Sequence, residues 1–164
     1  MANETLLTLE DTALDALKTL DITERGGYLR TRKAYQGELD VEAADQILLQ
    51  FPALLLFIDG MTFTPASTRG LEYIERPQLT VFVGDVNWRG ERDTRRGGVA
   101  PHEIGTYQMI RDALDTLAGK TFGLPIGPLV PKDVRSVVQS ATPPMSVYAV
   151  RFEVSDVEFN ATGD

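Results

Sequence analysis

Residues 79–86 read LTVFVGDV, a run rich in β-branched and aromatic residues that predicts a β-strand. Before it, residues 53–58 read ALLLFI, a short continuous apolar run typical of a strand buried on both faces. Nearer the C-terminus, apolar and polar residues alternate over residues 148–155, as in a half-buried strand. Weaker patterns at 28–35 and 133–140 indicate two further strands. These segments predict a sheet.

Three stretches have helical periodicity. Leu6, Leu9, Ala13, Leu17 and Leu20 are spaced as one face of a helix over residues 5–20. A second helix is expected after Asp40, a plausible N-cap, running over 41–51 and ended by Pro52. A third is expected from about Pro101, with Gly119 just past its end.

The remaining segments read as connections. Residues 60–77 contain several Thr, Ser, Pro and Gly residues and predict a long loop or an extended arm. Residues 87–100 lack periodicity and predict a mobile loop, and 123–131 form a proline-spaced linker. We therefore expect a single α+β (mixed α/β) domain over 1–164. It should have a largely antiparallel or mixed sheet packed by about three helices, and a polar tail at about 159–164.

Composition excludes several classes of protein. The 164 residues include no cysteine, which removes disulfides, thiolate catalysis and zinc sites that need sulfur. The net charge of −8 argues against a protein that coats nucleic acid. The longest apolar run, residues 53–58, is far shorter than the ~20 residues that span a bilayer, so no membrane partner is expected. The N-terminus lacks the pattern of a signal peptide, and we expect synthesis in the cytoplasm.

The usual catalytic motifs are missing from the sequence. His102 is the sole histidine, and position 106 holds Thr106 where a zinc-binding HExxH helix needs a second one. There is no Gly-x-Ser-x-Gly elbow, no phosphate-binding loop and no dinucleotide fingerprint. The carboxylate pairs Asp11/Asp15 and Asp112/Asp115 are expected on outward helix faces, as solvated charge. The sequence therefore predicts no catalytic residue, no metal site and no cofactor.

Basic charge is unevenly distributed. Arginine outnumbers lysine 12 to 4, and four of the arginines fall within residues 89–96. A second basic segment lies in residues 25–33, while the flanks of the chain are acidic. Solvated loops explain this pattern, and so does a surface with opposite charges on different faces that contacts a copy of itself or an ordered partner. The candidate interaction residues are Trp88, Arg89, Arg92, Arg95, Arg96, Arg30, Arg32 and Lys33.

Five stretches together resemble a known family. They are residues 33–39 (KAYQGEL), 51–56 (FPALLL), 107–114 (YQMIRDAL), 128–131 (PLVP) and 147–152 (VYAVRF). In this order they resemble small proteins encoded in the tail-morphogenesis segment of Mu-like phages and prophages. The resemblance spans about residues 5–158, and its motifs are patterns of fold rather than of chemistry.

The resemblance implies a structural virion protein similar to phage tail terminators. Such a protein forms a homo-oligomeric ring, commonly of six, at the head-proximal end of the tail tube. The ring stops tube polymerisation and offers a surface to head-completion and connector proteins. It implies a location in the virion tail after assembly in the bacterial host cytoplasm, with DNA passing through the lumen without specific binding. No catalytic residue and no role for residues 89–96 are implied.

Other hypotheses remain beside this one. Trp88 with the neighbouring arginines could stack a base or clamp an anion, which would make the chain an anion-binding or nucleic-acid-binding module. An undetected hydrolase would have to use His102. Within the structural class, a tail tube or connector subunit is a further alternative.

Overall fold

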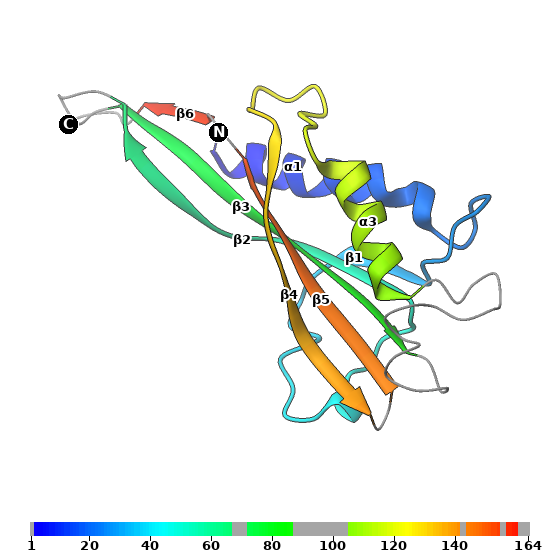
Figure 1. Ribbon diagram of the computed structural model, residues 1–164. Coiled ribbons are helices and arrows are strands. Elements are labelled where there is room, and N and C mark those ends of the chain that lie inside the picture. Colours follow the sequence, from blue (N-terminus) through cyan, green and yellow to red (C-terminus); the bar gives the residue numbers. More distant parts are fainter. Residues whose placement is uncertain (1, 67–71, 87–104, 142–143, 155–156, 161–164) are drawn as a thin grey trace.

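The computed structural model describes residues 2–66, 72–86, 105–141, 144–154 and 157–160, and Figure 1 shows their arrangement. Two α-helices, α1 (Ala2–Ala16) and α3 (Thr106–Leu117), cross the sheet, and short 3-10 helices span Leu17–Leu20 and Ala44–Gln46. The strands are β1 (Thr31–Ala34), β2 (Ala53–Pro65), β3 (Glu72–Val86), β4 (Leu129–Ala141), β5 (Pro144–Val154) and β6 (Val157–Asn160).

The strands form one mixed sheet in the order β1-β2-β3-β5-β4. β1 is parallel to β2, and the other neighbours are antiparallel. β3 pairs with β2 along almost its whole length. On its other side it pairs with β5 from Gln78 to Val86 and with β6 from Glu72 to Glu75. The expected α+β fold with a mixed sheet is confirmed, with two α-helices in the described residues in place of about three.

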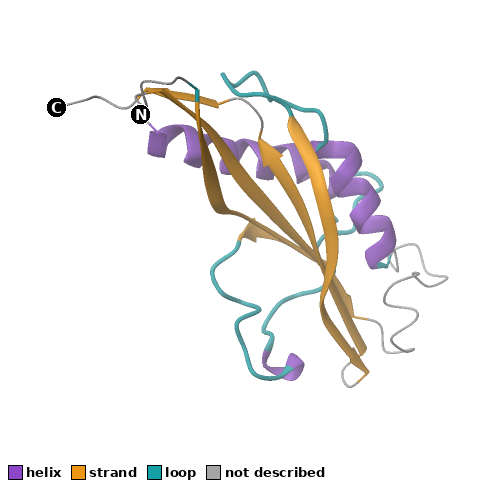
Figure 2. Ribbon diagram, turned by 60° about the vertical axis from the view of Figure 1, so that its left-hand side comes forward, coloured by secondary structure: helices purple, strands orange, loops and turns teal. Residues whose placement is uncertain are grey.

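The two faces of the sheet are covered differently. Leu79, Val81 and Val83 of β3 are fully buried on one face, beneath α1 and α3. On the other face the segment between β1 and β2 packs around Phe82 and Val147. There Gly84 allows a close approach, because a Cβ at this position would lie 3.0 Å from Phe51 Cε1. Figure 2 shows the helices on one side of the sheet and this segment on the other.

The distal halves of β2 and β3, residues 60–65 and 72–77, leave the body together with β6. Figure 1 shows this three-stranded ribbon, which we call the arm, extending away from the body. The sequence left two alternatives for residues 60–77, a long loop and an extended arm. The structure shows the extended arm over most of this range. The tip, residues 67–71, lies outside the described residues. β6 also continues the sheet to Asn160, so the polar tail expected from 159 begins within a strand.

The helix expected over 41–51 is wrong. Only Ala44–Gln46 turn, as a 3-10 helix, and Ile47 that follows is extended. The Gln46 side chain accepts hydrogen bonds from the backbone N–H groups of Glu42 and Ala43, which satisfies them without a longer helix. Leu48, assigned to the buried face of that helix, is 90% exposed. Other apolar residues of this segment, among them Ile47 and Phe51, pack against the sheet as individual side chains.

The remaining helices and strands agree with expectation apart from their ends. α1 is followed directly by the 3-10 helix, which ends at Leu20 as the periodicity predicts. Gly119 follows the end of α3 and has a positive φ of 73°. β4 begins at Leu129, inside the expected proline-spaced linker. The mobile loop expected at 87–100, and the start of the third helix at Pro101, lie outside the described residues.

Gly27 provides a test of the turn between α1 and β1. A Cβ at this position would lie 1.8 Å from the backbone oxygen of Asp21, so a side chain forces the backbone to move. We expect Gly27→Ala to lower the free energy of unfolding by about 3 kcal/mol, as overpacking does in a close-packed interior. Urea unfolding measures the loss. Gly60→Ala is the matched control, because nothing lies within 4 Å of its Cβ and its φ is not positive. Equal losses for the two variants would contradict this account.

Candidate assembly surfaces

The arginine-rich segment that the sequence singled out is not described by the structure. Trp88, Arg89, Arg92, Arg95 and Arg96 all fall within residues 87–104, outside the described residues. His102 lies in the same range. The interaction role of this segment, and the alternative hydrolase, stay predictions.

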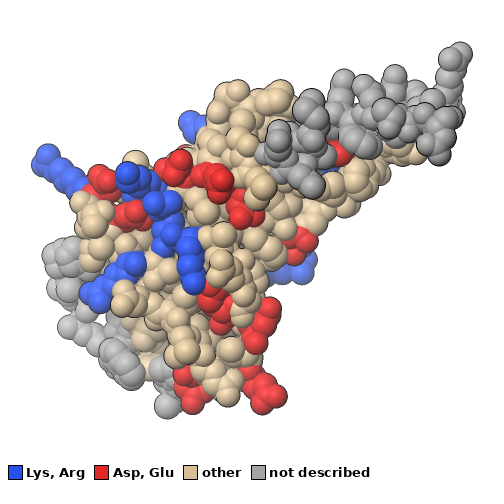
Figure 3. Space-filling model, turned by 180° about the vertical axis from the view of Figure 1, so that it is seen from behind, with Lys and Arg blue, Asp and Glu red and all other residues tan. Residues whose placement is uncertain are grey.

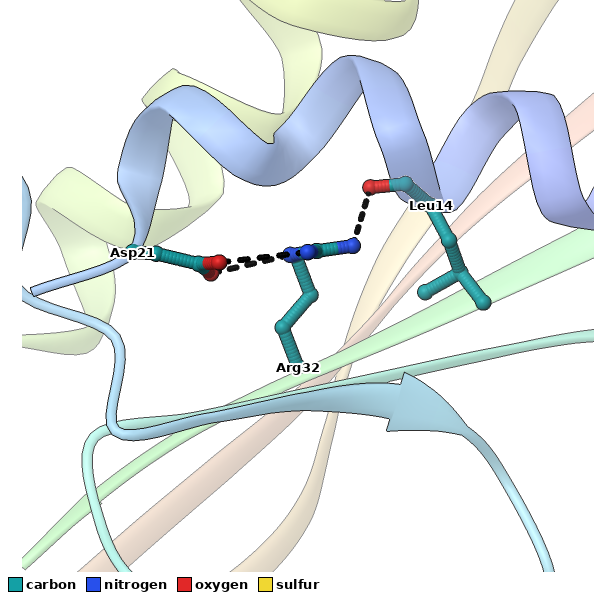
Figure 4. A network of polar contacts seen from close by, with 3 residues as sticks. All are labelled: Leu14, Asp21 and Arg32. Atoms are coloured by element: carbon teal, nitrogen blue, oxygen red, sulfur yellow. Dashed lines mark hydrogen bonds and ion pairs between the residues drawn. The ribbon is translucent and has the colours of Figure 1, made fainter. Parts of the chain in front are cut away.

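Arg32, from the second basic segment, has a structural role that its charge alone did not reveal. It projects from β1 toward the end of α1, where its Nε and Nη2 donate to the two carboxylate oxygens of Asp21 at 2.9 and 3.1 Å. Its Nη1 donates to the Leu14 carbonyl at 2.6 Å (Figure 4). Leu14 is in the last turn of α1, where carbonyls lack intrahelical partners and a cation is favourable. Arg32 therefore joins the helix end to the sheet.

The other two candidates of this segment lie closer to solvent. Arg30 is exposed, and the Lys33 ammonium pairs with Glu38 at 2.5 Å. Seen from behind, basic side chains gather on one flank of the body with acidic side chains among them, and further acidic side chains lie across the face and at its lower end (Figure 3). In this view the two signs of charge lie side by side, so the expectation of opposite charges on different faces stays a prediction. Of the three candidates, Arg32 is held by partners within the chain rather than offered to another molecule.

A second group of charges lies across β4 and β5, on the face opposite the helices. The Arg151 guanidinium forms a two-pronged contact with Asp133, and Arg135 lies 3.3 Å from the same carboxylate. Hydrogen bonding from Arg151 lowers the pKa of Asp133 below its ordinary value of 3.8. Nearby, Lys132 pairs with Glu153 at 3.4 Å. The sequence placed 133–140 in a strand but gave no sign of this network, because the partners are distant along the chain.

The expectation that Asp112 and Asp115 are both solvated is wrong for Asp112. Its carboxylate accepts a hydrogen bond of 2.7 Å from the Tyr28 hydroxyl and another from Gln108. Burial, followed by this hydrogen bond, raises the pKa of Tyr28 well above its ordinary value. Asp112 thus anchors α3 to the turn after α1. Asp115, its partner in the pair, is exposed as expected.

The arm presents apolar side chains on the face that carries the helices. Strand register puts Met61, Phe63 and Pro65 on this face, opposite Pro77, Glu75 and Tyr73. On this face Glu75 and Pro77 are buried, whereas Phe63, the cross-strand partner of Glu75, is 53% exposed. Sequence reasoning missed this surface, although the alternation of Met61, Phe63 and Pro65 with Thr62 and Thr64 is the signal that could have found it.

A groove lies at the other end of the sheet. It has a volume of about 350 Å³ and runs between the segment before β2 and the C-terminal part of β4. Its apolar lining includes Val41 and Val137, which are 38% and 46% exposed, together with Ile47 and Ala44. The sequence did not predict this groove because it expected a helix here.

In the described part of the chain, no group of three or more acidic or histidine side chains is placed to hold a metal ion. Its polar contacts join one element to another: Arg32 joins β1 to α1, Asp112 joins α3 to the turn, and Asp133 joins β4 to β5. Its exposed large apolar side chains include Phe63 on the arm and Val41 and Val137 at the groove, and also others elsewhere: Leu7, Ile22, Leu48, Tyr107, Val130 and Val134. The described polar contacts therefore serve the fold.

The sequence model of the family described as "Bacteriophage Mu, Gp37" matches residues 6–157. The chain belongs to the bacteriophage Mu Gp37 family. The match covers nearly the same range as the resemblance seen in the sequence and makes the chain a structural protein of Mu-like phages. A comparison with curated proteins found no match. Among the described residues, no helix has both the length and the apolar character needed to cross a membrane.

Replacing Arg32 tests its link between β1 and α1 in this Gp37-family chain. We expect Arg32→Ala to lower the free energy of unfolding by about 2 kcal/mol, because it leaves Asp21 and the Leu14 carbonyl without this donor. Arg32→Lys should recover only part of the loss, since a single ammonium cannot reproduce the guanidinium fork. Urea unfolding is the measurement, with Arg30→Ala on the exposed neighbour as the control. A loss as large for Arg30→Ala as for Arg32→Ala would refute the assignment.

Asp133 gives a prediction about pH. Because its pKa is lowered in the folded chain, its contribution to stability is full above the ordinary value of 3.8 and is lost as pH falls through the lowered value. Asp133→Asn should therefore be less stable than the wild type at pH 6, and the difference should shrink toward pH 2. Thermal unfolding across this range measures it, with the exposed Asp115→Asn as the control. A difference that stays constant with pH would show that the ion pair is not its source.

Proposed function

We propose that this Gp37-family protein is a tail terminator. In this role it forms a homo-oligomeric ring, commonly of six subunits, at the head-proximal end of the tail tube. The ring stops the polymerisation of the tube and presents a surface to head-completion and connector proteins. Membership in a Mu phage family supports a role in the virion, and the resemblance to tail-morphogenesis proteins supports a role in the tail.

The structural observation that carries the proposal is the arm. Phe63 on this ribbon is 53% exposed, so a partner that covered it would gain the free energy of burying an apolar side chain. A closed ring is built from head-to-tail contacts, in which two different patches of each subunit meet. The arm and the groove are two such patches, at different ends of the sheet. An arrangement of this kind favours assembly with copies of the same chain.

The charge of the chain fits a ring through which DNA passes. With a net charge of −8, the subunit avoids the counterion-driven binding that a basic surface would give. In the terminator role the protein works by shape and assembly, without catalysis and without a cofactor. Its site of action is the virion tail, after assembly in the cytoplasm of the bacterial host.

Electron microscopy of phage particles made without this protein tests the terminator role. We expect tail tubes of abnormal and excessive length, because nothing stops their polymerisation. Complementation with the wild-type chain should restore one uniform length. Tails of normal length without heads would instead indicate a connector that joins head and tail, and the absence of tubes would indicate a tube subunit. Either result would reject the terminator.

A further inference from the structure

We propose that residues 37–49, between β1 and β2, form a releasable strap on the sheet. In the closed state, which the structure describes, the strap covers an apolar patch of the face opposite the helices. In the open state it leaves the sheet while the core beneath the helices stays folded, and the patch becomes accessible to solvent. The inference goes beyond the proposed function, because strap release is a property of the isolated chain.

The strap lies on the sheet without being part of its hydrogen-bonded ladder. Its own backbone bonds are local, since the Asp40 amide donates to the Gly37 carbonyl at 3.0 Å and the Ile47 amide donates to the Ala44 carbonyl at 3.2 Å. Among the described residues, no backbone hydrogen bond joins the strap to a strand. Opening therefore leaves every strand pairing of the sheet in place.

Both ends of the strap are attached to β1. At one end Gly37 has a positive φ of 93°, and Glu38 pairs with the Lys33 ammonium at 2.5 Å. At the other end, just after the strap, the Thr31 hydroxyl donates to the Gln50 carbonyl at 2.8 Å. A released strap thus stays tethered at both ends and can return to the same position.

One buried side chain anchors the strap. Ile47 is 8% exposed and is the sole buried residue among 37–49. It belongs to a cluster with Met145 and Val147 of β5, around which partly buried strap residues pack. This cluster shares no residue with the larger core beneath α1 and α3. A segment with few buried apolar contacts, separate from the main core, opens at a lower free energy than the whole domain.

The packing under the strap is incomplete. A cavity of about 10 Å³ remains where Leu39 and Leu49 of the strap meet Phe82 and Val147 of the sheet. The groove of about 350 Å³ lies between the strap and β4 and brings solvent to its edge. Atoms that line a void lose dispersion contacts, so both spaces weaken the closed state.

The surface beneath the strap is continuous and apolar. Val138 of β4 pairs with Val147 of β5, and Phe82 lies on the same face of the neighbouring strand β3. Met145 is two residues before Val147 and shares its face. Exposed apolar patches of this kind mark interaction sites. The strap therefore keeps such a patch covered until it opens.

Hydrogen exchange of the full chain, followed by mass spectrometry at increasing urea, tests the release. We expect the strap amides to exchange through an opening with a weak dependence on urea, because little surface is exposed. Residues 79–83 of β3 should exchange only by global unfolding. The same urea dependence for strap and β3 would show that they open together, and strap amides without any protection would show that no closed state exists. Either result overturns the proposal.

Replacing the anchor provides the second test. We expect Ile47→Asp to speed strap exchange tenfold or more and to leave residues 79–83 as protected as in the wild type. Ile47→Val, which removes one methylene, should give a smaller change in the same direction. Leu48→Asp is the matched control, because Leu48 is adjacent and 90% exposed, and it should exchange like the wild type. Loss of β3 protection in both Ile47 variants, or equal effects of Ile47→Asp and Leu48→Asp, rejects the strap.

Proteolysis and dye binding then report what opening exposes. The strap contains no Lys or Arg, so a glutamate-specific protease is used, with cleavage after Glu38 and Glu42 identified by mass. We expect Ile47→Asp to be cut there tenfold faster than Leu48→Asp and to bind more anilinonaphthalene sulfonate, a dye for apolar surfaces. A faster cut without added dye binding would show that the patch stays covered, which overturns its release. The tail-length phenotype bears on the terminator role alone, so the two proposals fail independently.

Discussion

The structure depends on the pairing of β3 on both of its sides. Its C-terminal half has a buried row of Leu79, Val81 and Val83 beneath the helices, and its N-terminal half continues out of the body as the arm. One strand therefore belongs to the hydrophobic core and to a projecting surface. Because backbone hydrogen bonds run along nearly the whole strand, the direction of the arm is fixed by the packing of the core. A change in that packing would be transmitted to the arm.

The helices are held on this sheet by a few polar contacts as well as by apolar burial. Arg32 bonds the last turn of α1 from β1, and Asp112 of α3 accepts from Tyr28 in the turn that follows α1. Both contacts meet near the same turn, in which the backbone at Gly27 lies close to that of Asp21. The residues of the basic segment 25–33, which the sequence suggested as an interaction surface, therefore differ in their roles. Arg32 serves the fold, and Arg30 remains exposed.

The strands of the core could be predicted because each one has a hydrophobic pattern that is visible in its own local sequence. The strand patterns at 53–58 and 79–86, and the pattern from 148 as far as Val154, each match a strand most of whose apolar residues are buried. The sequence left a loop and an extended arm as alternatives because Thr, Ser, Pro and Gly are common in loops. The extended conformation of Thr62, Thr64 and Pro65 depends on pairing with residues 73–76 of β3, which are distant in the pattern that local analysis reads. The helix over 41–51 failed for a related reason. Its periodic apolar residues pack against a sheet that local periodicity does not describe.

The candidate site was harder to predict than the fold. Of the eight candidate interaction residues, five lie in 87–104, which the structure does not describe. A sixth, Arg32, is partly buried and bonds to Asp21 of the same chain. The structure shows instead an exposed aromatic side chain on the arm, Phe63, which no chemical motif distinguishes. The informative property of Phe63 is its position in the strand pairing of the arm. That position follows from the register of β2 on β3, and register is the step from sequence to structure that local patterns leave least determined.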